Sequence, residues 1–229
     1  MRNLLRTALD EAPAPVEVFF RDDDAGWGDE RLLELIARFE ATGLPLDLAV
    51  IPAELTPRLA ETLRERPVGL HQHGYAHVNH QREGRKCEFG SDRSRAQQQD
   101  DIARGRERLR ELLGDRLDPF FTPPWNRCTR DTGEALVALG FAGLSREHRA
   151  EPLGLLPEVS VHLDVARLTP EELDARFAAH VRAGGPVGVM FHHAVMEDAD
   201  LGRAAALLEL LASHANVAPR TLAELVAAC

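Results

Sequence analysis

The chain has 229 residues, 44% of them hydrophobic and 28% charged, which suits one substantial globular domain rather than two. Acidic residues outnumber Lys and Arg by 37 to 27, and the net charge of −10 argues against a nucleic-acid partner. No run reaches the roughly 18 apolar residues of a membrane span, and residues 1–15 lack the apolar core of a signal peptide. We therefore expect a cytoplasmic protein without a membrane span.

The first half of the chain alternates short apolar runs with amphipathic segments. It predicts strands at Val16–Phe20, Leu46–Ile51 and Val68–Leu70, and helices at Asp29–Glu40 and Thr56–Arg66. The resulting order, βαβαβ, is typical of a parallel sheet with helical crossovers.

The second half opens with a polar loop over residues 81–93 and continues the alternation of strands and helices. We predict strands at Phe120–Thr122, Phe141–Ser145, Val159–Val165 and Pro186–Phe191, and helices at Ser94–Leu113, Thr129–Leu139, from Thr169 onwards, Leu201–His214 and Thr221–Ala227. Seven strands alternating with helices favour an α/β barrel, closed or incomplete, as a single domain over residues 1–229.

Three polar clusters follow predicted strands. Residues 71–80 hold four of the ten histidines, an acidic turn spans Asp22 to Asp24, and the last strand runs into His192 and His193. The carboxyl ends of parallel strands share one face, so the three clusters should meet there. His73 and His77 are spaced so that both rings can point at one ion in a tight turn or single helical turn.

Two histidines and one carboxylate leave coordination positions open, which is typical of a catalytic metal site. Zinc, cobalt, nickel and iron all accept this ligand set, and zinc is the metal we expect. The alternatives to a metal site are that the two histidines are solvated on a polar loop and that the acidic turn caps the following helix.

These residues carry a resemblance to the polysaccharide deacetylase family, also called carbohydrate esterase family 4. Its second motif, two histidines separated by three residues, is similar to His73-Gly74-Tyr75-Ala76-His77, with glycine where Ser or Thr is usual. Its first motif is an Asp-Asp pair that supplies a base and a metal ligand. We place it on Asp23 as base and Asp24 as ligand, with Asp22 and Asp23 as the alternative frame. The resemblance implies a distorted (β/α) barrel of about seven parallel strands.

The other motifs match less closely. Thr122-Pro123-Pro124-Trp125 resembles the third motif, but Thr122 stands where the family has an arginine that steadies the base. Arg127 is the residue we consider for that task. The fifth motif resembles Val189 to His192, with His193 where aspartate is frequent, and Arg146 is a weak candidate for the fourth.

The resemblance implies a metal-dependent hydrolase in which metal-bound water attacks an amide carbonyl. Asp24, His73 and His77 would hold the metal, Asp23 would take the proton, and His192 would return it to the leaving amine. The expected substrate is a small or lipid-linked sugar that loses an N-acyl group, most simply N-acetyl. Residues expected beside the substrate or supporting this set are Asp22, His71, Trp125, Arg127 and His193.

Two other functions stay open. One is a non-catalytic or regulatory barrel that keeps the metal, and the other is a hydrolase of a non-sugar amide. The loop over residues 81–93, with Arg82, Arg85, Lys86 and Arg93, could bind an anionic group such as phosphate, although an ordinary solvated loop explains it too. The oligomeric state is left open.

Overall fold

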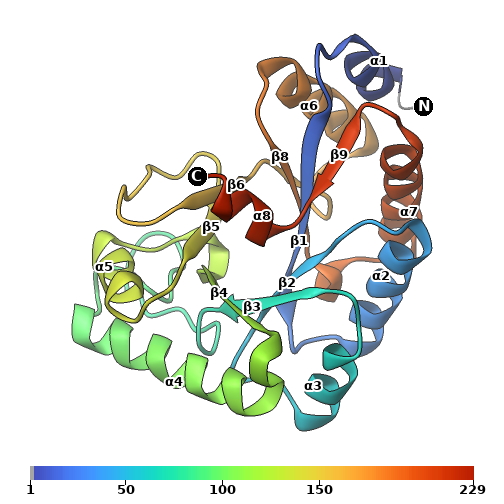
Figure 1. Ribbon diagram of the computed structural model, residues 1–229. Coiled ribbons are helices and arrows are strands. Elements are labelled where there is room, and N and C mark those ends of the chain that lie inside the picture. The colour runs from blue at the N-terminus through green and yellow to red at the C-terminus, as the bar shows by residue number, and fades with distance from the viewer. Residues whose placement is uncertain (1–2) are drawn as a thin grey trace.

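The structure is a computed structural model that describes residues 3–229 (Figure 1). Its strands are β1 (Val16–Ala25), β2 (Asp47–Val50), β3 (Gly69–His73), β4 (Leu117–Thr122), β5 (Gly143–Glu147), β6 (Glu158–Val161), β7 (Leu163–Asp164), β8 (Val187–Phe191) and β9 (Val217–Arg220). Its helices are α1 (Asn3–Glu11), α2 (Asp29–Thr42), α3 (Pro57–Arg64), α4 (Arg95–Leu113), α5 (Arg130–Ala138), α6 (Pro170–Ala183), α7 (Asp198–Ser213) and α8 (Leu222–Ala227), with 3₁₀ turns η1 (Gly114–Arg116), η2 (Pro124–Asn126) and η3 (His193–Val195).

The strands form one parallel sheet in the order β6-β5-β4-β3-β2-β1-β8-β7. The two edge strands of the sheet, β6 and β7, are consecutive in the chain and are separated by a kink at His162. β6 pairs with β5 at one edge, whereas β7 pairs with β8 at the other. At the kink the His162 N–H donates to the Gly188 carbonyl at 2.8 Å, and the Gly188 N–H donates to His162 Nδ1 at 2.9 Å. The sheet thereby curls into a nearly closed barrel, which confirms the predicted α/β barrel fold.

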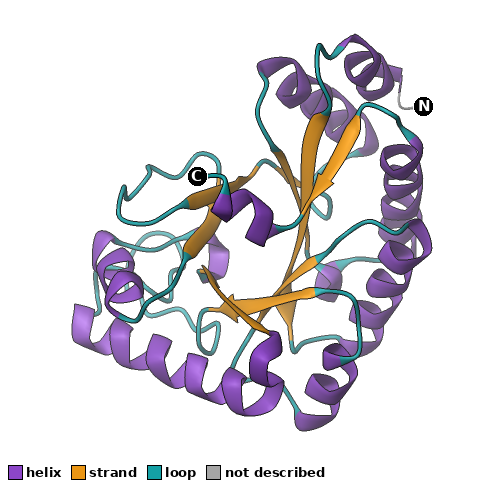
Figure 2. Ribbon diagram, viewed as in Figure 1, coloured by secondary structure: helices purple, strands orange, loops and turns teal. Residues whose placement is uncertain are grey.

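Helices cover the outside of the barrel (Figure 2). The large core cluster joins the outward side chains of β1, β2, β3 and β8, Val18 and Phe20 among them, to the apolar faces of α1, α2, α3, α6 and α7. On the long helix α4, Gly105 lies where an added Cβ would come within 2.4 Å of Gln72 Nε2. A glycine in the middle of this helix therefore allows it to pack closely on β3.

The alternation of side chains along β1 separates the core from the site. Phe19 belongs to a core cluster distinct from that of Val18 and Phe20, and it packs with residues of β6, β8 and α8. Successive strand residues point to opposite faces. Arg21 and Asp23 therefore share the inner face with Phe19, whereas Asp22 shares the outer face with Phe20.

Two elements lie outside the predicted set. Helix α1 packs on α6, and Asp174 accepts the Leu4 and Leu5 N–H groups at 3.3 and 3.1 Å. Strand β9 pairs with the start of β1 over Val16–Phe19. Among residues 3–229, no helix is both long enough and apolar enough to cross a membrane.

A buried carboxyl lies at the amino-terminal end of the strands, away from the polar clusters. Asp47 opens β2, and its Oδ2 accepts the N–H of Leu222 at the start of α8 at 2.8 Å. Burial, with the nearby charges of Asp118 and Glu224, raises the pKa of Asp47 to about 7 against the opposing hydrogen bond from Leu222. Because this value lies above the ordinary range, Asp47 lowers stability as pH rises from about 4 through 7.

We therefore predict that Asp47→Asn stabilises the protein at pH 8. The amide keeps an oxygen for the Leu222 N–H and removes the buried charge, which should raise the free energy of unfolding by about 1–3 kcal/mol. Urea unfolding from pH 4 to 8 should show the gain fading towards pH 4. Asp115→Asn, at an exposed position, is the control. A gain that does not vary with pH would contradict this account.

Candidate metal centre and active site

Asp24, His73 and His77 converge at the carboxyl ends of β1 and β3. The Nε2 atoms of both histidines lie 3.2 Å from one oxygen, Asp24 Oδ1. That oxygen is buried and accepts no hydrogen bond of acceptable geometry from the described residues. Two imidazoles and a carboxylate within 4.8 Å of one another are the donors that a divalent transition metal prefers. These three residues therefore fit such an ion.

A bulge in β1 brings two adjacent aspartates to the same side. The register with β2 shifts between Asp22 and Ala25, and Asp24 has a left-handed φ of 73°. In a regular strand Asp24 would point away from Asp23, but the turned backbone aims it at the histidines. Asp24 therefore joins the histidines. In the alternative frame Asp22 would be the base and Asp23 the ligand, but Asp22 contacts His193 and Asp23 contacts Arg21.

Backbone and ring contacts hold the two histidines. His73 Nδ1 lies 3.0 Å from the Thr122 carbonyl, which can only accept, so Nδ1 carries a proton and Nε2 is the ring atom that faces the centre. The His77 ring lies between Trp27 and Trp125, with ring centroids 4.8 and 4.4 Å away. The pair is thus oriented before any ion binds.

The turn between the histidines depends on a buried acid that we did not predict. Glu88 accepts the N–H groups of Tyr75 and Ala76 at 3.2 and 2.8 Å. Gly74 has a φ of 57°, and a Cβ there would come within 2.2 Å of Glu88 Oε2 and 2.6 Å of Pro124. Glycine at the position where Ser or Thr is usual therefore follows from this packing.

Asp23 is held by an arginine two residues before it in β1. Arg21 Nε and Nη2 donate to the two Asp23 oxygens at 2.7 and 2.9 Å. Burial alone would raise the pKa of Asp23, but the charges of Arg21, His73 and His192 hold it below its ordinary value. The contact considered for Arg127 is thus made by Arg21, while Arg127 Nη1 donates to the Lys86 carbonyl at 2.9 Å.

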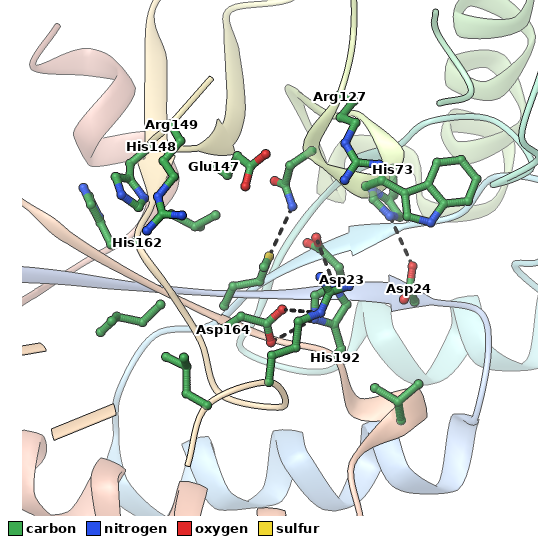
Figure 3. A pocket seen from close by; sticks show the side chains of 18 of the residues that line it. Asp23, Asp24, His73, Arg127, Glu147, His148, Arg149, His162, Asp164 and His192 are labelled. Atoms are coloured by element: carbon green, nitrogen blue, oxygen red, sulfur yellow. Dashed lines mark hydrogen bonds and ion pairs between the residues drawn. The ribbon is translucent and has the colours of Figure 1, made fainter. Parts of the chain in front are cut away.

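His192 faces Asp23 from the carboxyl end of the neighbouring strand β8 (Figure 3). Its Nε2 lies 3.9 Å from Asp23 Oδ2, and its Nδ1 lies 3.3 Å from Asp164 Oδ1. Burial would lower the pKa of His192, but its hydrogen bond to Asp164 and the charge of Asp23 outweigh burial and raise the pKa to about 9. Asp164, the last residue of β7, was not among the predicted site residues.

His193 turns away from this centre. Its Nδ1 lies 2.5 Å from Asp22 Oδ2 and its Nε2 lies 2.6 Å from the Trp27 carbonyl. Both residues of the Asp22–His193 pair are fully buried. The pair therefore fastens the end of β8 to β1 behind the site, and the orientation of His192 comes from Asp164 rather than from His193.

His71 and Thr122 form a second buried contact inside the barrel. His71 Nε2 lies 2.9 Å from Thr122 Oγ1. Burial and the positive charge of Arg21 lower the pKa of His71 to about 3, so its ring is neutral at pH 7. In β5 the residue that contacts Arg21 is Ser145, whose Oγ accepts from Nη1 at 2.7 Å, whereas Arg146 pairs with Glu158.

All five catalytic and metal candidates line one cavity of about 320 Å³. Trp125 and Arg127 line it as well, whereas Asp22, His71 and His193 lie behind it. Trp125 has a left-handed φ of 57°, which places its ring against His77 at the cavity wall. The arrangement presents a metal-binding face, an ionised carboxylate and a protonated imidazole to one partly enclosed cavity.

The sequence profile of the polysaccharide deacetylase family matches residues 22–144, more than half of the chain. The chain belongs to this family. The match includes Asp23, Asp24, His73 and His77, as well as the Thr122 to Trp125 segment. A search of curated proteins finds no match.

Solved structures of this family share the fold at low sequence identity. A Mycobacterium smegmatis protein assigned as a polysaccharide deacetylase is 15% identical with a TM-score of 0.74, over 95% of this chain and 93% of that one. A Clostridium thermocellum acetyl xylan esterase in complex with cobalt is 14% identical with a TM-score of 0.59, over 92% and 91%. A Bacillus anthracis family 4 pseudoenzyme is 11% identical with a TM-score of 0.66, over 94% and 66%.

We predict that Gly74→Ser, which restores a residue usual in the family, abolishes metal binding here. The side chain would collide with Glu88 and Pro124 and strain a left-handed backbone, moving His73 and His77 apart. Elemental analysis should find about one divalent ion per wild-type chain and a small fraction of that in the variant. Gly84→Ser is the control, because that loop glycine has open space around it. Full metal content in Gly74→Ser would refute this explanation.

Proposed function

We propose that this protein is a metal-dependent hydrolase that removes an N-acyl group, most simply N-acetyl, from a sugar. The observation that carries the proposal is the placement of Asp23 and His192 around a cavity whose wall contains the Asp24, His73 and His77 donors. A metal-ligand set flanked by one carboxylate and one imidazole suits hydrolysis of an amide.

Each side chain has a distinct task. Asp24, His73 and His77 would hold a divalent ion, which supplies a water of lowered pKa and polarises the substrate carbonyl. Asp23 accepts the proton, because its depressed pKa keeps it ionised at neutral pH. Arg21 fixes the carboxylate of Asp23 through two parallel hydrogen bonds.

His192 acts as the acid. Its raised pKa of about 9 keeps the imidazole protonated at neutral pH, so it can deliver a proton to the leaving amine nitrogen. Asp164 holds Nδ1, which leaves Nε2 directed towards Asp23 and the cavity.

Zinc is the metal we expect, and cobalt, nickel or iron would also suit two imidazoles and a carboxylate. The substrate is a small or lipid-linked N-acetylated sugar. The expectation of a cytoplasmic location stands as a prediction from the sequence.

The second candidate is a barrel that binds metal without hydrolysis. It is favoured by the likeness to a structure named as a pseudoenzyme. The lack of an arginine at Thr122 does not favour it, because Arg21 makes the contact with Asp23. The two candidates differ in whether substrate is turned over, not in the metal.

The test measures metal content and acetate release together. The wild type should hold about one ion per chain and release acetate from an N-acetylglucosamine oligomer. His73→Ala should lose both, whereas Asp23→Asn should keep the ion and lose turnover by roughly 10²–10⁴-fold. A wild type with metal but without acetate release from any N-acetylated sugar would favour the non-catalytic barrel, and a wild type without metal would exclude both.

The dependence of kcat/KM on pH should reveal how Asp164 affects the pKa of His192. Asp164→Asn removes the carboxylate that raises the pKa of His192, so the alkaline limb of kcat/KM should move down from about pH 9 towards the ordinary imidazole value. Asp10→Asn is a matched control, since Asp10 Oδ1 pairs with His214 at 3.2 Å outside the cavity. An unmoved alkaline limb in Asp164→Asn would show that His192 is not the acid.

A further inference from the structure

The cavity has a cationic rim, which we define as Arg85, Arg127, Arg149, Arg167 and Arg176. Five arginines around one cavity are unexpected in a chain whose net charge is −10. Figure 3 shows Arg149, with His148 and His162, on the opposite side of the cavity from His73 and Asp24. Arg149 therefore lies beyond the reacting centre, where the rest of a substrate would extend, whereas Arg127 lies on the His73 side of the cavity.

Most of the rim's charge is not neutralised. Arg85 and Arg149 have no ion pair in the part of the chain that the structure describes, whereas Arg167 Nε lies 3.1 Å from Asp164 and Arg176 Nη2 lies 3.9 Å from Glu172. Arg127 Nε is buried and has no hydrogen-bond partner among those residues. Burial first, and then the charge of Arg85, lowers the pKa of Arg127, as expected where positive charge accumulates.

The carboxylates of the cavity do not balance the rim. Asp23 is paired with Arg21, Asp24 faces the two histidines, and Asp164 is shared between His192 and Arg167. Glu147 is the remaining acidic residue among those that line the cavity.

The wall next to Arg149 adds a neutral hydrogen-bond donor. His162 Nδ1 accepts the Gly188 N–H at 2.9 Å, so a neutral ring carries its proton on Nε2. Burial, together with His180 and His148, lowers the pKa of His162 to about 4, and the three rings lie with centroids 4.6–5.2 Å apart. A bound anion would relieve this crowding of basic groups.

We propose that the cationic rim binds an anionic substituent, phosphate or carboxylate, on the sugar whose acyl group is removed. The inference rests on the proposed function and names its substrate class. Guanidinium groups match both anions with paired hydrogen bonds, and unpaired arginines in a partly enclosed cavity are suited to that task. Of the four basic residues of the loop over residues 81–93, Arg85 is the one that lines the cavity, whereas Arg93 pairs with Asp101 at 2.6 Å.

The experiment compares three probes that share one reacting group: N-acetylglucosamine, its 1-phosphate and its uronic acid. Affinity is measured by quenching of tryptophan fluorescence, because Trp125 lines the cavity, and acetate release is measured alongside. At least one anionic probe should bind about tenfold more tightly than the neutral sugar at low ionic strength, with the advantage shrinking as salt is added. The phosphate and carboxylate arms identify which anion the rim prefers.

In Arg85→Gln/Arg149→Gln the ratio of anionic to neutral affinity should fall towards one. The control Arg38→Gln/Arg58→Gln removes the same charge from exposed positions on α2 and α3 and should leave the ratio unchanged. Equal wild-type affinities for all three probes, or a ratio that the cavity variant does not alter, would overturn the inference. Acetate release from the neutral sugar with no anion preference would do so while leaving the hydrolase intact, whereas anion binding without turnover of any probe would refute only the hydrolase.

Discussion

The buried ion pair between Arg21 and Asp23 is the interaction on which the site depends. Burying two charges is costly unless their remaining hydrogen-bonding capacity is satisfied, and removing either partner leaves an uncompensated charge. Here Arg21 is completely buried, and beyond Asp23 its guanidinium donates to Ser145 on β5 and Asn126 in η2, each at 2.7 Å. One side chain of β1 therefore ties three parts of the barrel interior together around the carboxylate that we assign as the base.

The backbone of β1 gives the three consecutive aspartates, Asp22 to Asp24, three different environments. Alternation along β1 directs Asp22 outward to His193 and Asp23 inward to Arg21. The bulge and the left-handed backbone at Asp24 then break the alternation and bring Asp24 to the same face as Asp23. Left-handed non-glycine residues are strained, and here Asp24, His77, Trp125 and Asn126 all adopt that conformation around one cavity. The strain is therefore concentrated in the wall of the cavity that contains the metal-ligand candidates.

Much of this arrangement could be predicted from the sequence, because buried parallel strands read as short apolar runs and their polar ends as clusters. The barrel fold and the convergence of Asp24, His73 and His77 both follow from that pattern. Arg21 was missed because motif comparison placed the arginine in the segment at Thr122, not on the first strand. Asp164 and Glu88 were not predicted, because no local sequence pattern indicates that either residue reaches the site. Their positions depend on the kink at His162 and on a loop folding back under a turn.

In this chain the arginine that contacts Asp23 is on β1, not at residue 122, where the family has it. This difference explains the departure from the family pattern at Thr122. A charged carboxylate in the barrel interior needs a counter-charge or hydrogen-bond donors within reach, and an arginine on another inward-facing strand position can supply both. Arg21 does so from β1, and Thr122 then serves the histidines, with its hydroxyl at His71 and its carbonyl at His73. An arginine at residue 122 would compete with Arg21 for Asp23 and bring a second buried positive charge close to His71. Threonine at residue 122 is therefore compatible with arginine at residue 21, whereas a second arginine would not be. Its presence is no argument against hydrolysis.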